Sequence, residues 1–277
     1  MRSLARVKAG KGAAGEPLPT IFRVLHEWGI RPRRGQVTMV CAPPNCGKSL
    51  LTMYWVLRLA QGYGERVLYF SADTDEHDSK IRAAAMLTGH EMRKIENSYL
   101  ESDEAGEFYD DALEEFRNVR FEFESDPTYD HIGEVVEAYC EAWGDYPETI
   151  VIDNLSNVVT LNENEFSGMK EVTKAAKRLG RQTGAAVFIL HHQNESEVKD
   201  PRFPGSRKSI TGKVSQYPEL VLTLGMDDAL GVLRIACVKN RSGKKDPSGE
   251  TYVELQVDPA RMSLYGSIHD RRGGIVI

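Results

Sequence analysis

The segment from Ala42 to Ser49, APPNCGKS, constrains this chain more than any other. It follows a β-prone apolar run, Val37 to Cys41, and precedes a helical pattern of apolar residues that starts at Leu50. A strand, a loop that ends in Gly-Lys-Ser and a helix are together typical of a phosphate-binding loop. Backbone N–H groups at the positive end of a helix wrap the phosphates of a nucleotide. The sequence therefore predicts nucleotide binding by Ala42, Pro43, Pro44, Asn45, Cys46, Gly47, Lys48, Ser49 and Leu50.

Three residues of this loop have separate predicted roles. Gly47 lets the backbone approach the ligand because it has no Cβ. Lys48 is expected to place its ammonium on the β- and γ-phosphates of ATP, and Ser49 to give its hydroxyl to Mg²⁺. The first position is Ala42, where the general GxxxxGK[ST] pattern has glycine.

Strand and helix patterns alternate along most of the chain. Buried-strand patterns appear at residues 36–41, 66–71, 118–124, 148–153, 185–190, 219–224, 230–238 and 251–257. Helical patterns appear after the loop and at residues 81–87, 132–143 and 168–180. This order predicts an α/β fold with a mostly parallel twisted sheet flanked by helices, and active-site groups at the strand ends.

Polar residues follow several of these strands. Asp153 ends one strand and is expected to hold Mg²⁺ together with Ser49. Asp73 follows another strand and is a candidate base for the attacking water. Glu76 is the alternative base, because Asp75, Glu76 and Asp78 crowd nearby and one of these acids is expected only to cap the next helix. His191, His192 and Gln193 follow a third strand, where a γ-phosphate sensor would lie.

Charge is unevenly distributed over the 277 residues. The segment 96–148 holds 18 acidic and two basic residues, a net charge of −16; the whole chain carries −6, which leaves +10 for the rest. The acidic segment is interpreted as a solvated face, with a binding site for a partner protein as the alternative. Residues 1–16 predict a flexible basic arm, and residues 17–277 a single ATPase domain. No apolar run is long enough for a membrane span or a signal peptide, and four scattered cysteines favour a cytoplasmic protein.

A second basic segment follows His192. Residues 194–214 lack an apolar period and predict a long, mobile loop. Its cations are Lys199, Arg202, Arg207, Lys208 and Lys213. Such a loop fits contacts with nucleic-acid phosphates.

These motifs together resemble the ATPase domain of DnaB-type replicative helicases, in the RecA-like family of P-loop NTPases. The resemblance rests on the segments APPNCGKS at 42–49, FSAD at 70–73 with Arg82, IVIDNL at 150–155, LHH at 190–192 and KNRSG at 239–243. The family has Glu where this chain has Asp73, and Gln where it has His192. The family's N-terminal primase-binding domain has no counterpart before residue 17.

The resemblance implies a hexameric ring with ATP at subunit interfaces. Lys239 and Arg241 match family residues that reach the γ-phosphate of the neighbouring subunit. It also implies DNA, single-stranded or forked, in a central channel, contacted by loops after Asp153 and after His192. The implied function is a Mg²⁺-ATP-dependent DNA motor in replication or recombination.

Two other hypotheses remain open from the sequence. One is a structure-specific nuclease that uses the acidic cluster from Asp73 to Asp78. The other is an ATP-regulated recombination mediator or loader of the RecA-like type, which binds DNA and hydrolyses ATP very slowly.

Overall fold

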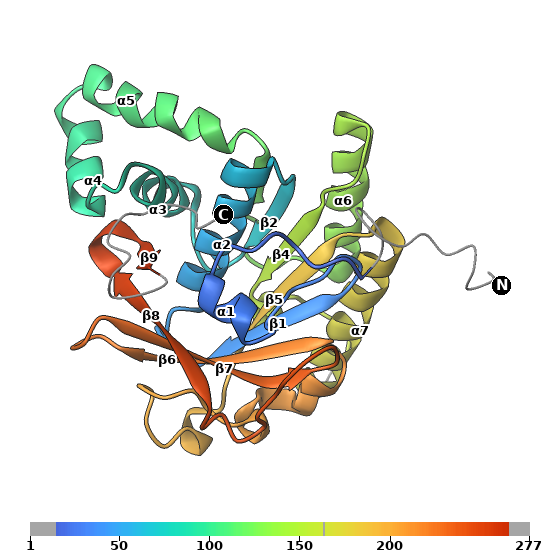
Figure 1. The fold of residues 1–277 in the computed structure, drawn as a ribbon. Helices are drawn as coiled ribbons and strands as arrows, with labels where there is room; N and C mark the ends of the chain where they lie inside the picture. Colours follow the sequence, from blue (N-terminus) through green and yellow to red (C-terminus); the bar gives the residue numbers. More distant parts are fainter. Residues whose placement is uncertain (1–14, 163, 266–277) are drawn as a thin grey trace.

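A nine-stranded sheet, with the order β3-β2-β4-β5-β1-β6-β7-β8-β9, forms the centre of the computed structural model, which describes residues 15–162 and 164–265 (Figure 1). The pairs from β3 to β6 are parallel and those from β6 to β9 are antiparallel. The predicted mostly parallel sheet is therefore confirmed. The strands are β1 (Val37–Ala42), β2 (Val67–Ser71), β3 (Val119–Glu122), β4 (Thr149–Asp153), β5 (Ala186–His192), β6 (Leu220–Asp227), β7 (Val232–Asn240), β8 (Tyr252–Asp258) and β9 (Ser263–Tyr265).

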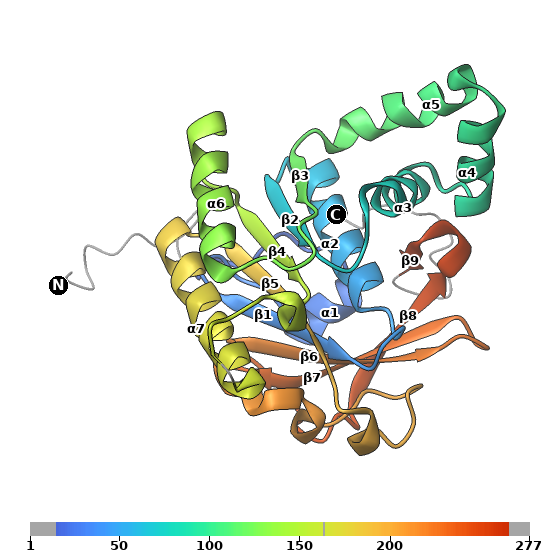
Figure 2. The same cartoon turned by 180° about the vertical axis from the view of Figure 1, so that it is seen from behind.

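Helices cover both faces of the sheet. One face carries α1 (Arg23–Glu27), α2 (Lys48–Tyr63) and α3 (Glu76–Thr88); the other carries α6 (Tyr129–Trp143) and α7 (Glu165–Thr183). Figure 2 shows α6 and α7 side by side on their face. Two further helices, α4 (Met92–Glu101) and α5 (Asp103–Leu113), extend beyond α3 at the margin of the molecule (Figures 1 and 2).

The way each strand and helix packs into the core follows from the spacing of its apolar side chains. In β1, Val40 and Ala42 face one layer of helices while Val37, Met39 and Cys41 face the other, as expected for a strand buried on both sides. Helix α2 is apolar around most of its circumference because it lies between the sheet and other elements.

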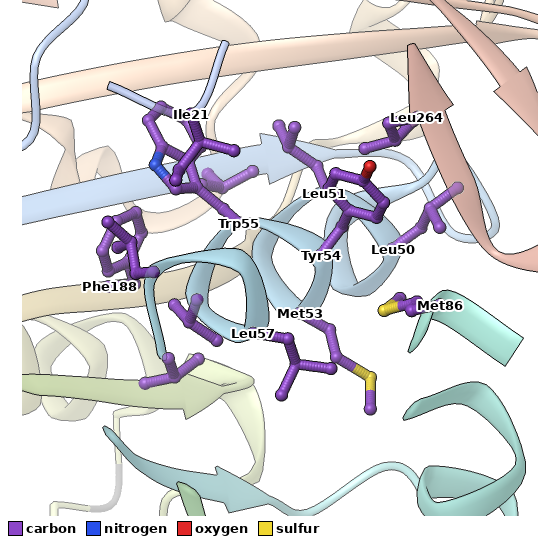
Figure 3. Close-up of a cluster of buried hydrophobic side chains, with 14 of the residues drawn as sticks. Ile21, Leu50, Leu51, Met53, Tyr54, Trp55, Leu57, Met86, Phe188 and Leu264 are labelled. Atoms are coloured by element: carbon purple, nitrogen blue, oxygen red, sulfur yellow. The ribbon is translucent and has the colours of Figure 1, made fainter. Parts of the chain in front are cut away.

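Figure 3 shows the packing around α2. Trp55 lies beside Ile21 and Phe188, with its ring 5.9 Å from that of Phe188, while Leu50 points toward Leu264. All five of these side chains are at most 8% exposed. This packing fixes the helix that begins at the phosphate-loop lysine.

The acidic segment forms α5, β3, α6 and part of α4. Most of its acidic side chains are exposed, as expected for a solvated face. One of these acids, Asp110, forms an ion pair with Lys80 at 2.7 Å that joins α5 to α3.

The structure differs from the sequence predictions in two places. The short strand β9 was not predicted. The segment 194–214, predicted as a long mobile loop, contains the 3₁₀ helices η4 (Glu195–Glu197) and η5 (Arg207–Ser209) and most of η6 (Thr211–Gln216). Ser209 and Val214 within it are buried. The predicted basic arm falls almost entirely on residues 1–14, which lie outside the described part of the chain.

Candidate functional site

Four parallel strands bring the candidate residues to one edge of the sheet. The pairing places Ala42 beside His192 and Ser71 beside Asp153. Because β2, β4, β5 and β1 are neighbours, the carboxyl ends of all four meet. Ligands of open α/β sheets bind at this edge.

The turn between β1 and α2 has the shape of a phosphate-binding loop. Asn45 and Gly47 have φ values of 58° and 77°, in the left-handed region. A Cβ on Gly47 would lie 3.1 Å from Met226 Cε and 3.2 Å from Leu233 Cδ1. Both the backbone conformation and the close packing therefore require glycine here.

Lys48 lies inside this loop with only 7% of its surface exposed. Its Nζ donates to the carbonyl oxygens of Ala42 at 3.3 Å and Pro43 at 3.2 Å, and it lies 3.3 Å from His192 Nδ1. Burial lowers the pKa of this ammonium, although Asp153 and other acidic groups oppose the shift. A buried cation whose hydrogen-bond acceptors are neutral is suited to receive an anion.

Asp153 lies at the end of β4 and is 4% exposed. Its Oδ2 accepts a hydrogen bond of 2.8 Å from the hydroxyl of Tyr69, and its carboxylate also bonds the side chain of Ser49. Burial raises the pKa of Asp153, while these two hydrogen bonds and Lys48 oppose the increase.

The hydroxyl of Ser49 and the carboxylate of Asp153 are hydrogen-bonded to each other. This oxygen pair fits Mg²⁺, which binds through one or two protein oxygens and completes its shell with phosphate and water. Within residues 15–162 and 164–265, no group of three or more His, Cys, Asp or Glu side chains could hold a metal ion. A cation at this edge would therefore need the oxygens of a bound nucleotide.

Asp73 lies across the edge from Lys48, and Asn154 and His192 lie between them. Asn154 Nδ2 donates to Asp73 Oδ2 and lies 3.4 Å from His192 Nε2. Because His192 also contacts Lys48, an unbroken series of contacts joins Lys48 to Asp73.

Asn154 was missed by the sequence analysis. The available signal was its position directly after Asp153, followed by Ser156. Its Oδ1 accepts hydrogen bonds from both the backbone N–H, at 2.9 Å, and the hydroxyl of Ser156. An Asn-x-Ser sequence is typical of such a turn.

The other acids after β2 have different environments. Asp75 caps α3, because its Oδ1 accepts from the backbone N–H of Asp78 at 2.8 Å. This confirms that one of the acids serves as a helix cap. Glu76 is exposed and lines a separate cavity with Leu113 and Phe121.

His191 and His192 point to opposite sides of β5, as adjacent residues of a strand do. His191 is fully buried, and its Nε2 lies 3.0 Å from the carbonyl oxygen of Thr211. Burial lowers its pKa to about 4, so the ring is neutral at pH 7. Burial and Lys48 also lower the pKa of His192.

Lys239 and Arg241 lie away from this edge. The pairing of β1, β6 and β7 places Lys239 level with Met39, and the backbone N–H of Arg241 bonds Glu219. Arg241 therefore lies near the amino end of β1, whereas the phosphate-binding loop of the same chain follows its carboxyl end. The separation along the strand is about five residues, or roughly 16 Å.

The two cations differ in exposure and partners. Lys239 Nζ is buried and donates to the carbonyl oxygens of Ser215 at 2.9 Å and Gln216 at 2.7 Å. Its pKa is lowered to about 8 by burial and by Arg241. The side chain of Arg241 is 53% exposed and lies 3.8 Å from Glu219. Arg241 is therefore free to reach outward, whereas Lys239 holds η6 against β7.

The basic residues after β5 surround a cavity of about 1390 Å³. Four of the five predicted cations line it, namely Lys199, Arg207, Lys208 and Lys213. Arg202 does not line it and instead pairs with Asp200 at 2.8 Å. Acidic Glu197, Asp200 and Glu250 share the wall, so the cavity is mixed in charge.

The AAA domain family matches residues 18–197. The chain is 33% identical over 256 residues to the Gene 65 protein of Mycobacterium phage L5, covering 89% of this chain and 91% of that protein. It is 23% identical to a probable plasmid replicative DNA helicase of Chlamydia trachomatis, covering 87% of this chain but only 55% of the helicase.

Two solved structures share the fold. One is described as an ATPase domain and superposes with a TM-score of 0.76 at 13% identity, covering 91% of this chain and 93% of that domain. A DnaB-like replicative helicase, described with its interactions with primase, gives 0.75 at 14% identity, covering 92% of this chain and 63% of that one. The described part of this chain contains no helix with the length and apolarity of a membrane span.

Proposed function

This chain belongs to the AAA domain family, and from this premise we propose that it is an ATPase that acts as a helicase-type DNA motor in replication. The observation that carries the proposal is the series of contacts from Lys48 through His192 and Asn154 to Asp73, beside Ser49 and Asp153. A sequence relative described as a probable plasmid replicative DNA helicase, a DnaB-like replicative helicase of the same fold and an ATPase domain of the same fold support it.

Nucleotide binding is assigned to residues 42–50. The Lys48 ammonium exchanges its bonds to Ala42 and Pro43 for the β- and γ-phosphates of ATP. Backbone N–H groups at the start of α2 complete the phosphate cradle. Because Lys48 is buried, its attraction to a phosphate is weakly screened by solvent.

Ser49 and Asp153 are assigned to Mg²⁺. Bound there, the cation would supply charge neutralisation at the phosphates. Tyr69 holds the Asp153 carboxylate in place through its hydrogen bond of 2.8 Å. Asp153 remains ionised when a cation offsets the burial that raises its pKa.

Asp73 is assigned as the base that takes a proton from the attacking water. Its contact with Asn154 turns it toward His192 and Lys48, whereas Glu76 lines a different cavity. The geometry therefore favours Asp73 over Glu76.

Arg241 is assigned to the nucleotide of a neighbouring copy in a homo-oligomeric ring. Its distance from Lys48 along the strands excludes action within one chain, and its half-exposed side chain favours action on another. Lys239 contributes to this role indirectly, because its ammonium binds carbonyl oxygens of η6 and holds that helix against β7. The ring is expected to be a hexamer, as in the family that the sequence resembles.

DNA is the proposed polyanionic partner. The cavity lined by Lys199, Arg207, Lys208 and Lys213 offers several cations on one concave surface. Each phosphate contact releases a counterion, so the affinity for single-stranded DNA should fall steeply with salt. Residues 17–277 are proposed to form one ATPase domain of a cytoplasmic protein.

A strand-displacement assay tests this function. Labelled forked DNA is incubated with the purified chain and Mg²⁺, with and without ATP. The motor predicts displacement of intact strands only with ATP. Shortened strands would support the nuclease, and DNA binding without measurable ATP hydrolysis would support the mediator or loader.

A further inference from the structure

The side-chain amide of Asn154 has only one orientation that satisfies its neighbours. Asp73 offers a carboxylate oxygen, which must face the NH₂ group. The backbone N–H of Ser156 is a donor, which must face the amide oxygen. With Asn154 only 2% exposed, these partners fix its NH₂ group between Asp73 and His192.

His192 consequently lies between two donors. The ammonium of Lys48 is 3.3 Å from Nδ1, and the NH₂ group of Asn154 is 3.4 Å from Nε2. A neutral imidazole accepts a hydrogen bond at only one of its two nitrogens. Without a phosphate ligand, the charged donor Lys48 takes the acceptor, so Nδ1 accepts and Nε2 carries the proton. The Nε2–H then faces another donor in Asn154.

Binding of ATP would remove this conflict. The Lys48 ammonium would move to the phosphates and release Nδ1. The imidazole would then lose the proton at Nε2 to water and gain one from water at Nδ1, so that the ring is neutral before and after the exchange. Nδ1–H could donate to the γ-phosphate while Nε2 accepts from Asn154.

We propose that Asn154 is a positioning residue that couples an occupied γ-phosphate position to Asp73 through the tautomer of His192. One NH₂ hydrogen of Asn154 bonds Asp73 and the other gains an acceptor only after the tautomer changes. The Asp73 carboxylate is then held by a fully bonded amide when a γ-phosphate is present. This inference rests on the proposed ATPase function and adds a sensor to it.

The first experiment is the kinetics of Asn154→Asp. This change keeps the acceptor for Ser156 and removes the donor to Asp73 and His192. The expected result is a kcat for ATP hydrolysis lowered about 100-fold, because the base is misplaced. The KM should change by less than about threefold, since Asn154 makes no proposed contact with the nucleotide.

The chain offers a matched control for this variant. Asn194 also accepts from the backbone N–H and hydroxyl of a serine two residues on, Ser196, at 3.1 and 2.9 Å. It is exposed. Asn194→Asp makes the same substitution in the same local turn and should leave DNA-independent hydrolysis unchanged. A kcat of Asn154→Asp equal to that of Asn194→Asp would overturn the inference.

The second experiment needs no variant for its main result. Imidazole ¹⁵N spectra of the wild-type chain are recorded without nucleotide and with a Mg²⁺–nonhydrolysable ATP analogue, and His192→Gln assigns the signal. The expected change is loss of the proton from Nε2 and its gain at Nδ1. If the analogue binds by calorimetry and the tautomer is unchanged, the inference fails while the ATPase proposal stands. If no nucleotide binds at all, both fail.

Discussion

The Nζ atom of Lys48 lies 3.3 Å from Nδ1 of His192. The two residues are 144 positions apart in the sequence and meet because β1 and β5 pair in parallel, with Ala42 beside His192. The lysine of the phosphate-binding loop and the proposed phosphate sensor are thus in contact. In the proposed function ATP draws the Lys48 ammonium away from Nδ1, which would link nucleotide binding to the state of His192.

Replacement of Asp73 distinguishes the two candidate bases. Asp73→Asn should lower kcat by about 10²- to 10⁴-fold, the usual contribution of a general base, and leave nucleotide affinity largely unchanged. Glu76→Gln should keep nearly full activity because Glu76 lines another cavity. Steady-state hydrolysis and calorimetric binding measure both effects. The opposite ranking of the variants would transfer the role to Glu76.

Arg241 can be tested for action between subunits. Arg241→Ala should lower kcat by about 10³-fold or more and keep nucleotide binding. Mixing it with Lys48→Ala should restore part of the activity, because some interfaces then pair an intact Lys48 with an intact Arg241. Hydrolysis is measured across mixing ratios. Normal hydrolysis by Arg241→Ala alone would show that the assignment is wrong.

Much of this architecture could be predicted from local sequence patterns. The buried strands are short apolar runs, and the segment at 42–49 marks the turn from β1 to α2. The succession of strands along the chain and the edge of the sheet that carries the site could therefore be predicted. Asp73, Asp153 and His192 became candidate site residues because each ends or follows such a run.

Contacts that depend on tertiary packing could not be predicted in this way. The role proposed for Asn154 depends on its contacts with Asp73, which follows β2, and with His192, which ends β5. Similarly, η6 has no apolar period of its own and is ordered because the ammonium of Lys239 binds its carbonyl oxygens. The difference in solvent exposure between Arg241, which is half-exposed, and Lys239, which is buried, also arises only in the folded chain.

A buried ion pair at the opposite edge from the site should contribute strongly to stability. Arg34 bonds both oxygens of Glu65, at 2.8 and 2.7 Å, and Glu65 is 3% exposed. Glu65→Ala removes both carboxylate contacts of a guanidinium whose side chain is only 16% exposed and leaves it the carbonyl oxygen of Glu148. This change should lower the free energy of unfolding by about 3–5 kcal/mol. Chemical denaturation monitored by circular dichroism measures it.

The control for this prediction is an exposed pair at a similar distance, with a single contact in place of two. Arg23 and Glu27 lie 2.7 Å apart with side chains 73% and 56% exposed. Glu27→Ala should cost less than about 0.5 kcal/mol. Equal losses from both variants would refute a special contribution from Glu65.

His191 predicts a defined dependence of stability on pH. Burial lowers its pKa from 6.5 to about 4, so the unfolded chain takes up a proton in this window before the folded chain does. The free energy of unfolding should therefore fall as the pH decreases through this window, by about 2 kcal/mol between pH 7 and pH 5 from this group. His191→Gln should lose this component. Denaturation curves at both pH values that show the same loss of stability for the two proteins would disprove it.

The most direct test of the account is ATP hydrolysis by the wild-type chain and by Lys48→Ala, each with and without single-stranded DNA. The account predicts Mg²⁺-dependent hydrolysis that DNA stimulates in the wild type. It predicts a loss of about 100-fold or more in Lys48→Ala, because the phosphates lose their buried cation. Circular dichroism and thermal unfolding should show that the variant is folded. Equal hydrolysis by the two folded proteins, or none by the wild type with DNA and Mg²⁺ present, would contradict the account.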